Sequence, residues 1–264
     1  MKIYYNKKNS ILYHADVIEV FNNLDAEIVD LIFADPPYNL SNDGTTCHSG
    51  KRVSVNKGKW DASRGIEEDF TFHSEWIAAC RRVLKPNGSL WISGTYHSIY
   101  ACGFALQQQG WHLVNDICWY KPNAAPNLAC RMFTASHETL LWSRKSKKSK
   151  HYFNYELSKL GNWERDFLKK PEKQMRSVWA IHTPKKEEKE FGKHPTQKPE
   201  ALLERIILTC SREGDTILDQ YCYGEQAGWT HKAVVWDSLI TVSDGNGLQI
   251  FCDGNDNDVF EGGI

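Results

Sequence analysis

An apolar stretch from Ala26 to Ala34, AEIVDLIFA, constrains the fold of this chain more than any other feature of the sequence. It is typical of a strand that is buried on both faces, and it ends at Asp35, Pro36 and Pro37. Because proline fixes φ and has no N–H to donate, a strand cannot continue through this pair. Strands buried on both faces occur mostly in parallel sheets covered by helices, so the stretch predicts such a sheet.

Helical and strand-like patterns alternate along most of the chain. Apolar residues recur at helical spacing in 73–84, 96–109 and 199–210, and the other strand-like runs are 89–93, 111–120, 138–143 and 215–218. This alternation predicts an α/β fold with a mostly parallel sheet and helices on both faces. A chain of 264 residues is long enough for one such domain with an insertion.

Charge is distributed unevenly, although the formal net charge is only −1. Residues 144–198 contain sixteen Lys and Arg against seven Asp and Glu, whereas residues 220–264 contain seven acidic residues against one lysine. The lysine-rich segment 146–190 has no apolar period, which indicates an insertion. A basic excess suits a polyanionic partner such as a nucleic acid, and a merely solvated surface is the alternative.

Cysteine usage and the N-terminal sequence bear on the compartment. The eight cysteines are scattered without C-x-x-C spacing, so we expect reduced thiols in the core and neither disulfides nor a metal site. The opening MKIYYNKKNS lacks the apolar stretch of a signal peptide, and no later segment has the length and apolarity of a membrane span. These features predict a cytoplasmic protein.

The turn from Asp35 to Tyr38 is the strongest candidate for a binding site. Ligands of open parallel sheets bind beyond the carboxyl ends of the strands, where this turn falls. The Asp35 carboxylate and the Pro36 carbonyl can accept both hydrogens of an exocyclic amino group while Tyr38 stacks on the ring. Such acceptors make the amino nitrogen of adenine more nucleophilic, and the base has to leave the double helix to reach them. An ordinary rigid turn is the alternative interpretation.

Several motifs together resemble a known enzyme family. FADPPYNL is similar to the catalytic motif of DNA methyltransferases that methylate amino groups with S-adenosylmethionine (SAM), and its acidic first residue resembles the adenine-N6 enzymes. YHADVIEVFNNL, KPNGSLWISG, WYKPNAAPNLACRMFTASHETLLWSRK and GKHPTQKPEALLERII resemble further motifs in the permuted order of the β class, in which the catalytic half precedes the cofactor half. The resemblance covers about residues 1–219 and is greatest to small Dpn-type enzymes that modify GATC in restriction-modification systems. It implies a Rossmann-like, SAM-dependent methyltransferase fold with circularly permuted motifs.

The resemblance also implies roles for individual residues. The catalytic residues would be Asp35, Pro36, Pro37 and Tyr38, and the cofactor-binding residues Asp16, His194, Thr196, Lys198 and Asp219. Asp16 can equally cap a helix, and the residues before Pro199 taken alone indicate a loop and a helix start. Phosphate contacts to DNA would come from Lys147, Lys148 and Lys150 in the insertion. The implied partner is DNA, and a homodimer is compatible with the family.

The sequence departs from the family after Asp219. Relatives continue with a proline, an aromatic residue and a G-S-G turn that lets the backbone approach SAM, whereas this chain has QYCYGEQAGW and then an acidic sequence. We therefore divide the chain into a methyltransferase domain, 1–219, and an atypical tail, 220–264, and we expect a sheet that is incomplete at its C-terminal edge. A change of reading frame after Asp219 and a divergent but functional cofactor loop are alternative explanations of the tail.

Two functions follow from these observations. The first is an adenine-N6 DNA methyltransferase, and the second is a catalytically impaired, DNA-binding homologue that lacks a usable SAM loop. Methylation of RNA or of protein glutamine fits less well, since those enzymes commonly place the cofactor motif first. Cytosine-C5 methylation is disfavoured because it needs a cysteine nucleophile that usually follows proline, and the sequence has no Pro-Cys pair.

Overall fold

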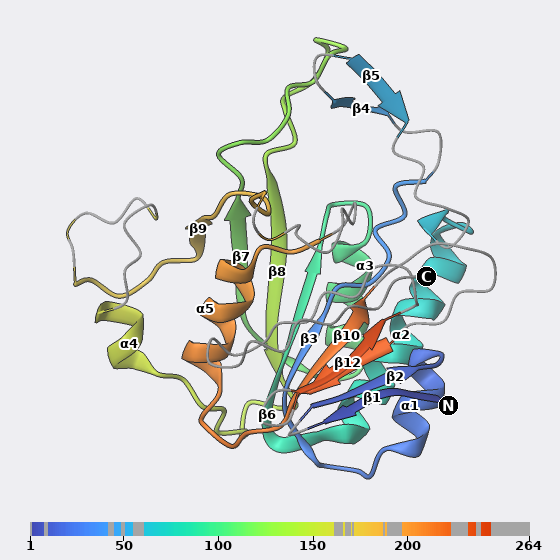
Figure 1. The fold of residues 1–264 in the computed structure, drawn as a ribbon, viewed down its shortest axis with the longest axis vertical. Helices are drawn as coiled ribbons and strands as arrows, with labels where there is room; N and C mark the ends of the chain where they lie inside the picture. The colour runs from blue at the N-terminus through green and yellow to red at the C-terminus, as the bar shows by residue number, and fades with distance from the viewer. Residues whose placement is uncertain are drawn as a thin grey trace.

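The chain folds around a mixed sheet of ten described strands with helices on both of its faces (Figure 1). The computed structural model describes residues 2–7, 10–41, 45–48, 51–54, 61–160, 166, 170, 172–186, 188, 197–222, 232–235 and 239–243. Helices α2 (Ile66–Val83) and α3 (Ile99–Gln108) lie on one side of the sheet, and α5 (Glu200–Cys210) lies on the other. This arrangement is the predicted α/β architecture.

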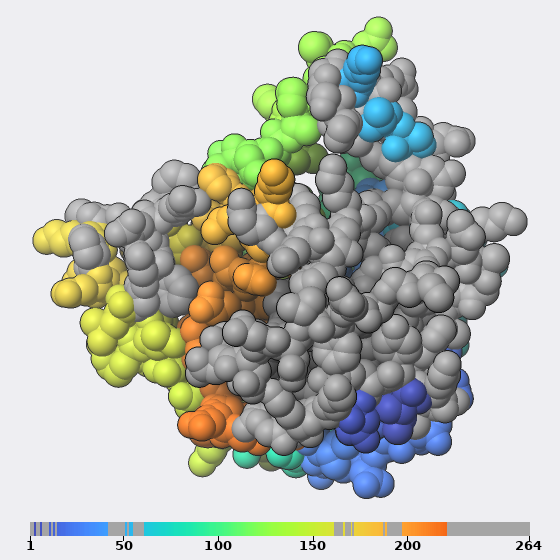
Figure 2. Space-filling model, in the orientation of Figure 1, coloured from blue at the N-terminus to red at the C-terminus, as the bar shows by residue number. Residues whose placement is uncertain are grey.

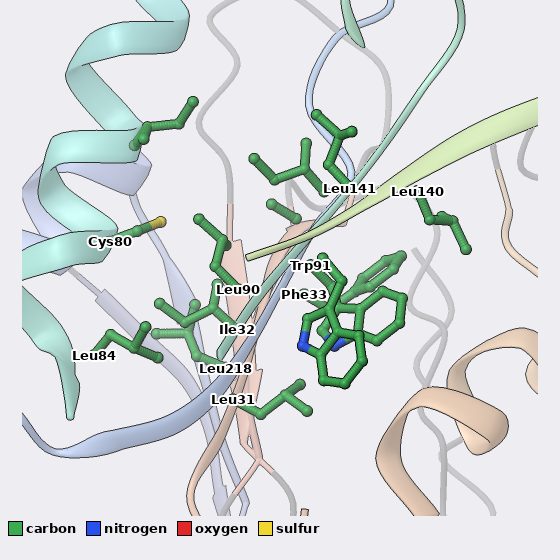
Figure 3. Close-up of a cluster of buried hydrophobic side chains, with 14 of the residues drawn as sticks. Leu31, Ile32, Phe33, Cys80, Leu84, Leu90, Trp91, Leu140, Leu141 and Leu218 are labelled. Atoms are coloured by element: carbon green, nitrogen blue, oxygen red, sulfur yellow. The ribbon is translucent and has the colours of Figure 1, made fainter. Parts of the chain in front are cut away.

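Three parallel strands form the centre of the sheet. β3 (Val29–Ala34) lies between β6 (Leu84–Gly94) and β10 (Ile217–Cys222), and Ile32 is in register with Leu90 on one side and Leu218 on the other. All three of these side chains are fully buried, and Figure 3 shows them grouped together beside Cys80 of α2. The apolar run that opened the sequence analysis is therefore a central strand, as predicted.

The sheet is mixed, which differs from the mostly parallel sheet that the alternation predicted. β8 (His137–Arg144) is antiparallel to β6, and β7 (His112–Tyr120) is antiparallel to β8. The physical reason is that 121–136 connects β7 to β8 without a helix, and a parallel connection needs a crossover of a dozen or more residues that is usually helical. The same connection projects from the top of the molecule in Figure 2.

The lysine-rich insertion contacts both helix α5 and the sheet. Helix α4 (Tyr155–Leu160) contacts α5, and β9 (Val178–Ala180) extends the sheet by pairing in parallel with β7. Trp179 of β9 is buried against Trp91, with ring centroids 5.9 Å apart. The insertion therefore returns the chain to the same end of the sheet at which β7 ends.

The edge beyond β10 carries further described strands. β12 (Leu239–Ser243) pairs in parallel with both β10 and β2 (Ser10–His14), β11 (Lys232–Val235) is antiparallel to β12, and β1 (Lys2–Lys7) is antiparallel to β2. The expectation of an incomplete edge is therefore wrong for this structure, because the tail and the N-terminal hairpin supply strands there. A separate hairpin consists of β4 (Thr45–His48) and β5 (Lys51–Ser54).

Helix boundaries differ from the sequence pattern mainly at α2, which begins seven residues before the predicted segment 73–84. Its first turns, IEED, carry acidic side chains that favour a helix N-terminus but bury little apolar surface, so they lack a period. Cys80, Cys102 and Cys210 are free and buried, as expected for core thiols. Cys118 is only half-buried, and Cys130 is exposed, so the expectation is wrong for Cys130, which lies in the connection between β7 and β8 and not in a core element. Among the described residues, none of the helices combines the length and apolarity that crossing a bilayer would require.

Candidate active site

The motif from Asp35 to Tyr38 lies where β3 ends, at the centre of the sheet. The Asp35 amide still donates to the Gln220 carbonyl of β10 at 3.2 Å, and the two prolines then end the ladder. All four residues of the motif are buried. Asn39 follows with φ 57, a left-handed conformation that asparagine tolerates better than most residues. The chain thus makes a fixed turn at the carboxyl end of the sheet.

Asp61 holds the backbone that follows this turn. Its Oδ1 accepts from the Tyr38 amide at 2.9 Å, and its Oδ2 accepts from the Leu40 amide at 3.1 Å and the Ser41 hydroxyl at 2.9 Å. The residue is only 1% exposed, so this carboxylate replaces the strand partners that the prolines remove. Sequence reasoning missed Asp61, because neither a motif nor a periodic pattern marks KWDAS.

Both oxygens of the Asp35 carboxylate have partners inside the protein. Oδ1 lies 2.7 Å from the Tyr38 hydroxyl and accepts from Ser93 Oγ of β6 at 2.6 Å, and Oδ2 accepts from Lys198 Nζ at 2.6 Å. Lys198 precedes α5, so the contact joins residues that are far apart in sequence. The candidate catalytic acid is therefore fixed in a polar cluster, which we call the Asp35 cluster: Asp35, Tyr38, Ser93, Lys121, Glu138, Lys198 and Asp219.

Glu138 closes the Asp35 cluster from the side of β8. Its Oε2 lies 2.8 Å from the Tyr38 hydroxyl and 3.8 Å from Lys198 Nζ, and its Oε1 accepts from Lys121 Nζ at 2.9 Å. Burial would raise the pKa of Glu138, but the charges of Lys198 and Lys121 outweigh it and lower the pKa. Neither Glu138 nor Ser93 was predicted as a site residue. Ser93 is near the end of β6 and Glu138 is near the start of β8, and these positions at strand termini are the sequence feature that could have indicated them.

Lys198 is a buried cation in this cluster. Burial alone lowers the pKa of a lysine, but Asp35 and then Glu138 more than compensate, so the pKa of Lys198 is raised above its ordinary value. Its Nζ also lies 5.0 Å from the centroid of the Tyr38 ring, within reach of a cation–π interaction. The side chain of Lys198 pairs with the candidate catalytic carboxylate, and the SAM contact that the sequence predicted for it stays a prediction.

Asp219 adds a third carboxylate from β10. It is in register with Phe33 of β3, and burial, followed by the charge of Asp35, raises its pKa from 3.8 to about 7 against the opposing effect of Lys198. Burial, followed by the charges of Asp35 and Glu138, keeps the pKa of the Tyr38 hydroxyl well above its usual range. The Asp35 cluster therefore contains three acids and two ammonium groups, an arrangement that favours an added positive charge.

The remaining predicted cofactor residues are Asp16, His194 and Thr196. Asp16 caps α1 (Val17–Asn23), with its Oδ1 accepting from the Ile18 amide at 2.8 Å and the Glu19 amide at 3.3 Å, so the capping alternative describes its observed contacts. His194 and Thr196 lie outside the described residues. In the described part of the chain, no group of three or more His, Cys, Asp or Glu side chains is arranged to hold a metal ion.

Lys147, Lys148 and Lys150 are exposed but lie far from the Asp35 cluster. They follow the end of β8 at Arg144, which is in register with Ser89, whereas Glu138 is at the other end of the same strand. Six residues of strand separate the two ends by about 20 Å. The structure therefore does not bring these lysines to the candidate site.

Comparison with known proteins identifies the class. Residues 29–228 match the family model described as DNA methylase, so the chain belongs to this family, and the resemblance noted in the sequence is confirmed. Enzymes of this family transfer methyl groups to DNA. The fold is that of a Rossmann-like methyltransferase, since the structure aligns with the crystal structure of an M1.HpyAVI–SAM complex at a TM-score of 0.53 and 28% identity over 79% of this chain and 80% of that one.

Relatives within the family are more similar in sequence. The chain is 52% identical over 221 residues to the type II methyltransferase M2.LlaDCHI of Lactococcus lactis subsp. cremoris, which covers 83% of this chain and 79% of that protein. It is 51% identical to M2.DpnII of Streptococcus pneumoniae, over 83% of this chain and 80% of the relative. M2.MboI of Moraxella bovis is 44% identical over 81% of this chain and 76% of its own length.

Proposed function

We propose that this chain methylates the N6 amino group of adenine in DNA, with SAM as the methyl donor, after the base has left the double helix. The observation that carries the proposal is the fixed turn from Asp35 to Tyr38 at the carboxyl end of β3, with its carboxylate held by Ser93 and Lys198. The DNA methylase family and the type II methyltransferase relatives support it. M1.HpyAVI, which was crystallised with SAM, supports the choice of cofactor.

The proposed chemistry of the site depends on hydrogen-bond acceptors. Asp35 and the Pro36 carbonyl accept the two amino hydrogens of adenine, which localises the nitrogen lone pair, and Tyr38 covers the ring. SAM, when bound, supplies the methyl group on a positively charged sulfur. The side chains of this chain orient the nucleophile and compensate charge, and no covalent intermediate with the protein is required.

The composition of the Asp35 cluster fits a cationic cofactor. SAM carries a sulfonium and an ammonium group, and Asp35 and Asp219 place two carboxylates at the ends of neighbouring strands, where the charge of Lys198 acts on both. We propose Asp219 as the carboxylate that meets the cofactor, with Asp16, His194, Thr196 and Lys198 as its further contacts. A ligand with positive charge would lower the pKa of Asp219 by favouring its ionised form.

We propose that DNA binds across the same end of the sheet. The connection 122–136 exposes Phe133 at 98% and Met132 at 66% of their surface, next to the exposed Arg131. Asn123 ties this connection to the segment after β9, since its amide group exchanges hydrogen bonds with Thr183 at 2.9 and 3.1 Å. That segment carries the exposed Lys185 and Lys186. Apolar and cationic side chains together suit the bases and phosphates of DNA.

Lys147, Lys148 and Lys150 are proposed as additional phosphate contacts, for a DNA segment long enough to reach the opposite end of β8.

GATC is the proposed recognition sequence, supported by the similarity to M2.DpnII and M2.MboI. Methylation of cellular DNA within a restriction-modification system implies action in the bacterial cytoplasm.

A homodimer is proposed as the assembly. Helix α3 exposes Tyr100 at 75% and Phe104 at 58%, and Ile66 at the start of α2 is 84% exposed. Phe104 already contacts Phe70 of α2, with ring centroids 5.3 Å apart, so these side chains form one apolar surface. Sedimentation of the wild type and a Tyr100→Ser/Phe104→Ser variant tests the proposal, because a dimer through this face should dissociate in the variant.

The second candidate function is a DNA-binding homologue with impaired catalysis. The observation in its favour is that the relatives align over only 221 residues and that the sequence after Asp219 lacks the glycine-rich turn. Calorimetric titration with SAM separates the candidates. Micromolar affinity supports the methyltransferase, whereas millimolar or absent binding together with intact DNA binding supports the impaired homologue.

The decisive experiment is methylation of plasmid DNA followed by sequencing that detects N6-methyladenine. Wild-type protein should modify one short sequence, and an Asp35→Ala variant should modify none while binding DNA normally. Methyl groups on cytosine, or equal incorporation by the variant, would overturn the proposed function.

A further inference from the structure

In the arrangement described, the Asp35 carboxylate has one lone pair left for an adenine amino group, on Oδ2. One oxygen of Asp35 is occupied by Ser93 and Tyr38 and the other by Lys198, with distances of 2.6 to 2.7 Å. The proposed function needs one of these oxygens as an acceptor for the substrate. At Oδ2 the amino group would share the oxygen with the Lys198 ammonium, and that positive charge weakens the oxygen as an acceptor. Lys198 is therefore the internal partner whose departure would strengthen Asp35 most when the base enters.

A count of hydrogens shows why the cluster is poised to rearrange. Four contacts join the Tyr38 hydroxyl, the Ser93 hydroxyl, Asp35 Oδ1 and Glu138 Oε2, at 2.6, 2.7, 2.8 and 3.0 Å. The two hydroxyls carry only two hydrogens between them, so two ionised carboxylates leave the tyrosine oxygen facing at least one acceptor without a hydrogen. If Lys198 moves to Glu138 Oε2, that oxygen gains a donor and the Tyr38 hydrogen can remain on Asp35.

Lys198 has a second acid within reach if it leaves Asp35. Its Nζ is 3.8 Å from Glu138 Oε2, about 1 Å longer than a charge-assisted hydrogen bond. A buried lysine with no counterion is strongly unfavourable, so a displaced Lys198 requires such an acceptor. Among the described carboxylates, Asp219 also affects Lys198, but Glu138 affects it more.

We infer that Glu138 is a positioning residue for the proposed methyl transfer: it takes Lys198 over from Asp35 when the adenine enters, and so frees the Asp35 carboxylate for the amino group. This inference rests on the proposed function. Lys121 restrains the exchange, because it holds the other oxygen of Glu138 and competes with Lys198 for its charge. The exchange needs only a short movement of one ammonium group between two carboxylates that are already in place.

The inference is tested with a duplex that carries 2-aminopurine beside the target adenine, whose fluorescence rises when that adenine leaves the stack. No cofactor is needed for this measurement. We expect Glu138→Gln to reduce the fluorescence change at saturating DNA at least tenfold, to lower kcat by a similar factor, and to leave the Kd for DNA within twofold. Glu138→Asp should restore part of both, and Glu204→Gln, an exposed change on α5, should match the wild type.

A second variant has the opposite expected sign. Lys121→Gln frees Glu138 to bind Lys198, so the fluorescence change should increase and the KM for DNA should fall, which loss of structure cannot produce. If Glu138→Gln is unstable in thermal unfolding, Lys121→Gln alone decides. The inference would be overturned if the folded Glu138→Gln variant gave the same fluorescence change as the wild type, or if Lys121→Gln gave a smaller one. If either of these results is found and the wild-type protein still methylates adenine, the proposed function remains intact. If the wild-type protein does not extrude the adenine at all, both the inference and the proposed function are overturned.

Discussion

Two buried ion pairs in this molecule have similar chemistry but different surroundings. Asp166 of the insertion pairs with Arg205 of α5, and its other oxygen accepts from the Ala180 amide at 2.9 Å. Asp35 pairs with Lys198 at 2.6 Å, but a second acid, Glu138, lies 3.8 Å from the same ammonium. In the first pair, Asp166 is the acid that acts on Arg205 among the described residues, and the rigid guanidinium also lies over the Trp179 ring at 5.0 Å. In the second pair, the lysine has two carboxylates within reach.

The difference separates a structural pair from a functional one. A guanidinium with a fixed fork and one partner holds two elements in a single arrangement, here β9 and α5. A lysine with a flexible stem between two carboxylates can exchange partners at little cost. Burial alone therefore says little about function, and the number of competing acceptors around a buried cation says more.

Removing Asp166 should give the largest effect on stability. Asp166→Ala leaves the Arg205 charge buried without its carboxylate, which typically costs about 3–5 kcal/mol. We expect the free energy of unfolding in urea to fall by about that amount. Asp35→Ala should cost less, because Lys198 retains Glu138. Equal losses in the two variants would remove the distinction between the pairs.

Asp35→Ala should give the largest effect on chemistry. Deleting a single preorganised hydrogen-bonding group at a reacting atom typically lowers kcat by about 10²–10³-fold, and we expect at least this loss in single-turnover methylation. Asp166→Ala, assayed below its unfolding temperature, should keep kcat within threefold of the wild type. A catalytic defect of equal size in Asp166→Ala would mean that the two pairs act as one unit.

Stability should depend on pH through the Asp35 cluster. Because the pKa of Asp219 is raised from 3.8 to about 7, the folded chain holds a proton that the unfolded chain has lost between these values. The associated stabilisation is complete below about pH 4 and is lost as the pH rises through about 7. The limiting slope is about 1.4 kcal/mol per pH unit, and we expect less, because Asp219 keeps partial contact with solvent.

Asp219→Asn removes this titration. Urea unfolding of the wild type and of the variant at intervals between pH 5 and 8 should give a flatter profile for the variant. Identical slopes would show that another group in the cluster carries the proton.

The smallest expected effects concern the surface lysines. Each phosphate contact that is lost should reduce the slope of log Kd for DNA against log salt by about 0.9. We expect Lys185→Gln/Lys186→Gln, at the site end of the sheet, to reduce the slope more per lysine than the triple change of Lys147, Lys148 and Lys150 to Gln. A slope unchanged in the triple variant would confine the DNA footprint to the site end.

Sequence reasoning found the parts of the site that are local in the chain. A strand that ends in two prolines is visible in LIFADPPY, because one segment contains both the apolar run and its terminator. It did not find Glu138 or Ser93, which reach Tyr38 across 100 and 55 residues of sequence. Those contacts depend on the antiparallel placement of β8 beside β6, and that placement has no local pattern to predict it.

Lys198 shows the same limit in another form. Its segment was recognised by resemblance, and the cofactor contact that the resemblance implies stays a prediction. The pairing of Lys198 with a carboxylate could not be predicted, because it depends on which acid lies nearest once the sheet has formed. Asp35 lies there because β3 and α5 meet at the same end of the sheet. The tail was judged by its missing motif and its acidic composition, and neither reveals that β12 pairs with β10 and β2.

The stacked indoles in the core provide an optical reporter of the insertion. Trp91 and Trp142 stack with ring centroids 5.0 Å apart and planes inclined by 12°, and Trp179 of β9 approaches the same pair. Chromophores at this separation couple their electronic transitions, so near-ultraviolet circular dichroism should contain an exciton contribution from the group. Detachment of β9 would change that spectrum without unfolding the central sheet, which gives a direct view of whether DNA loosens the insertion.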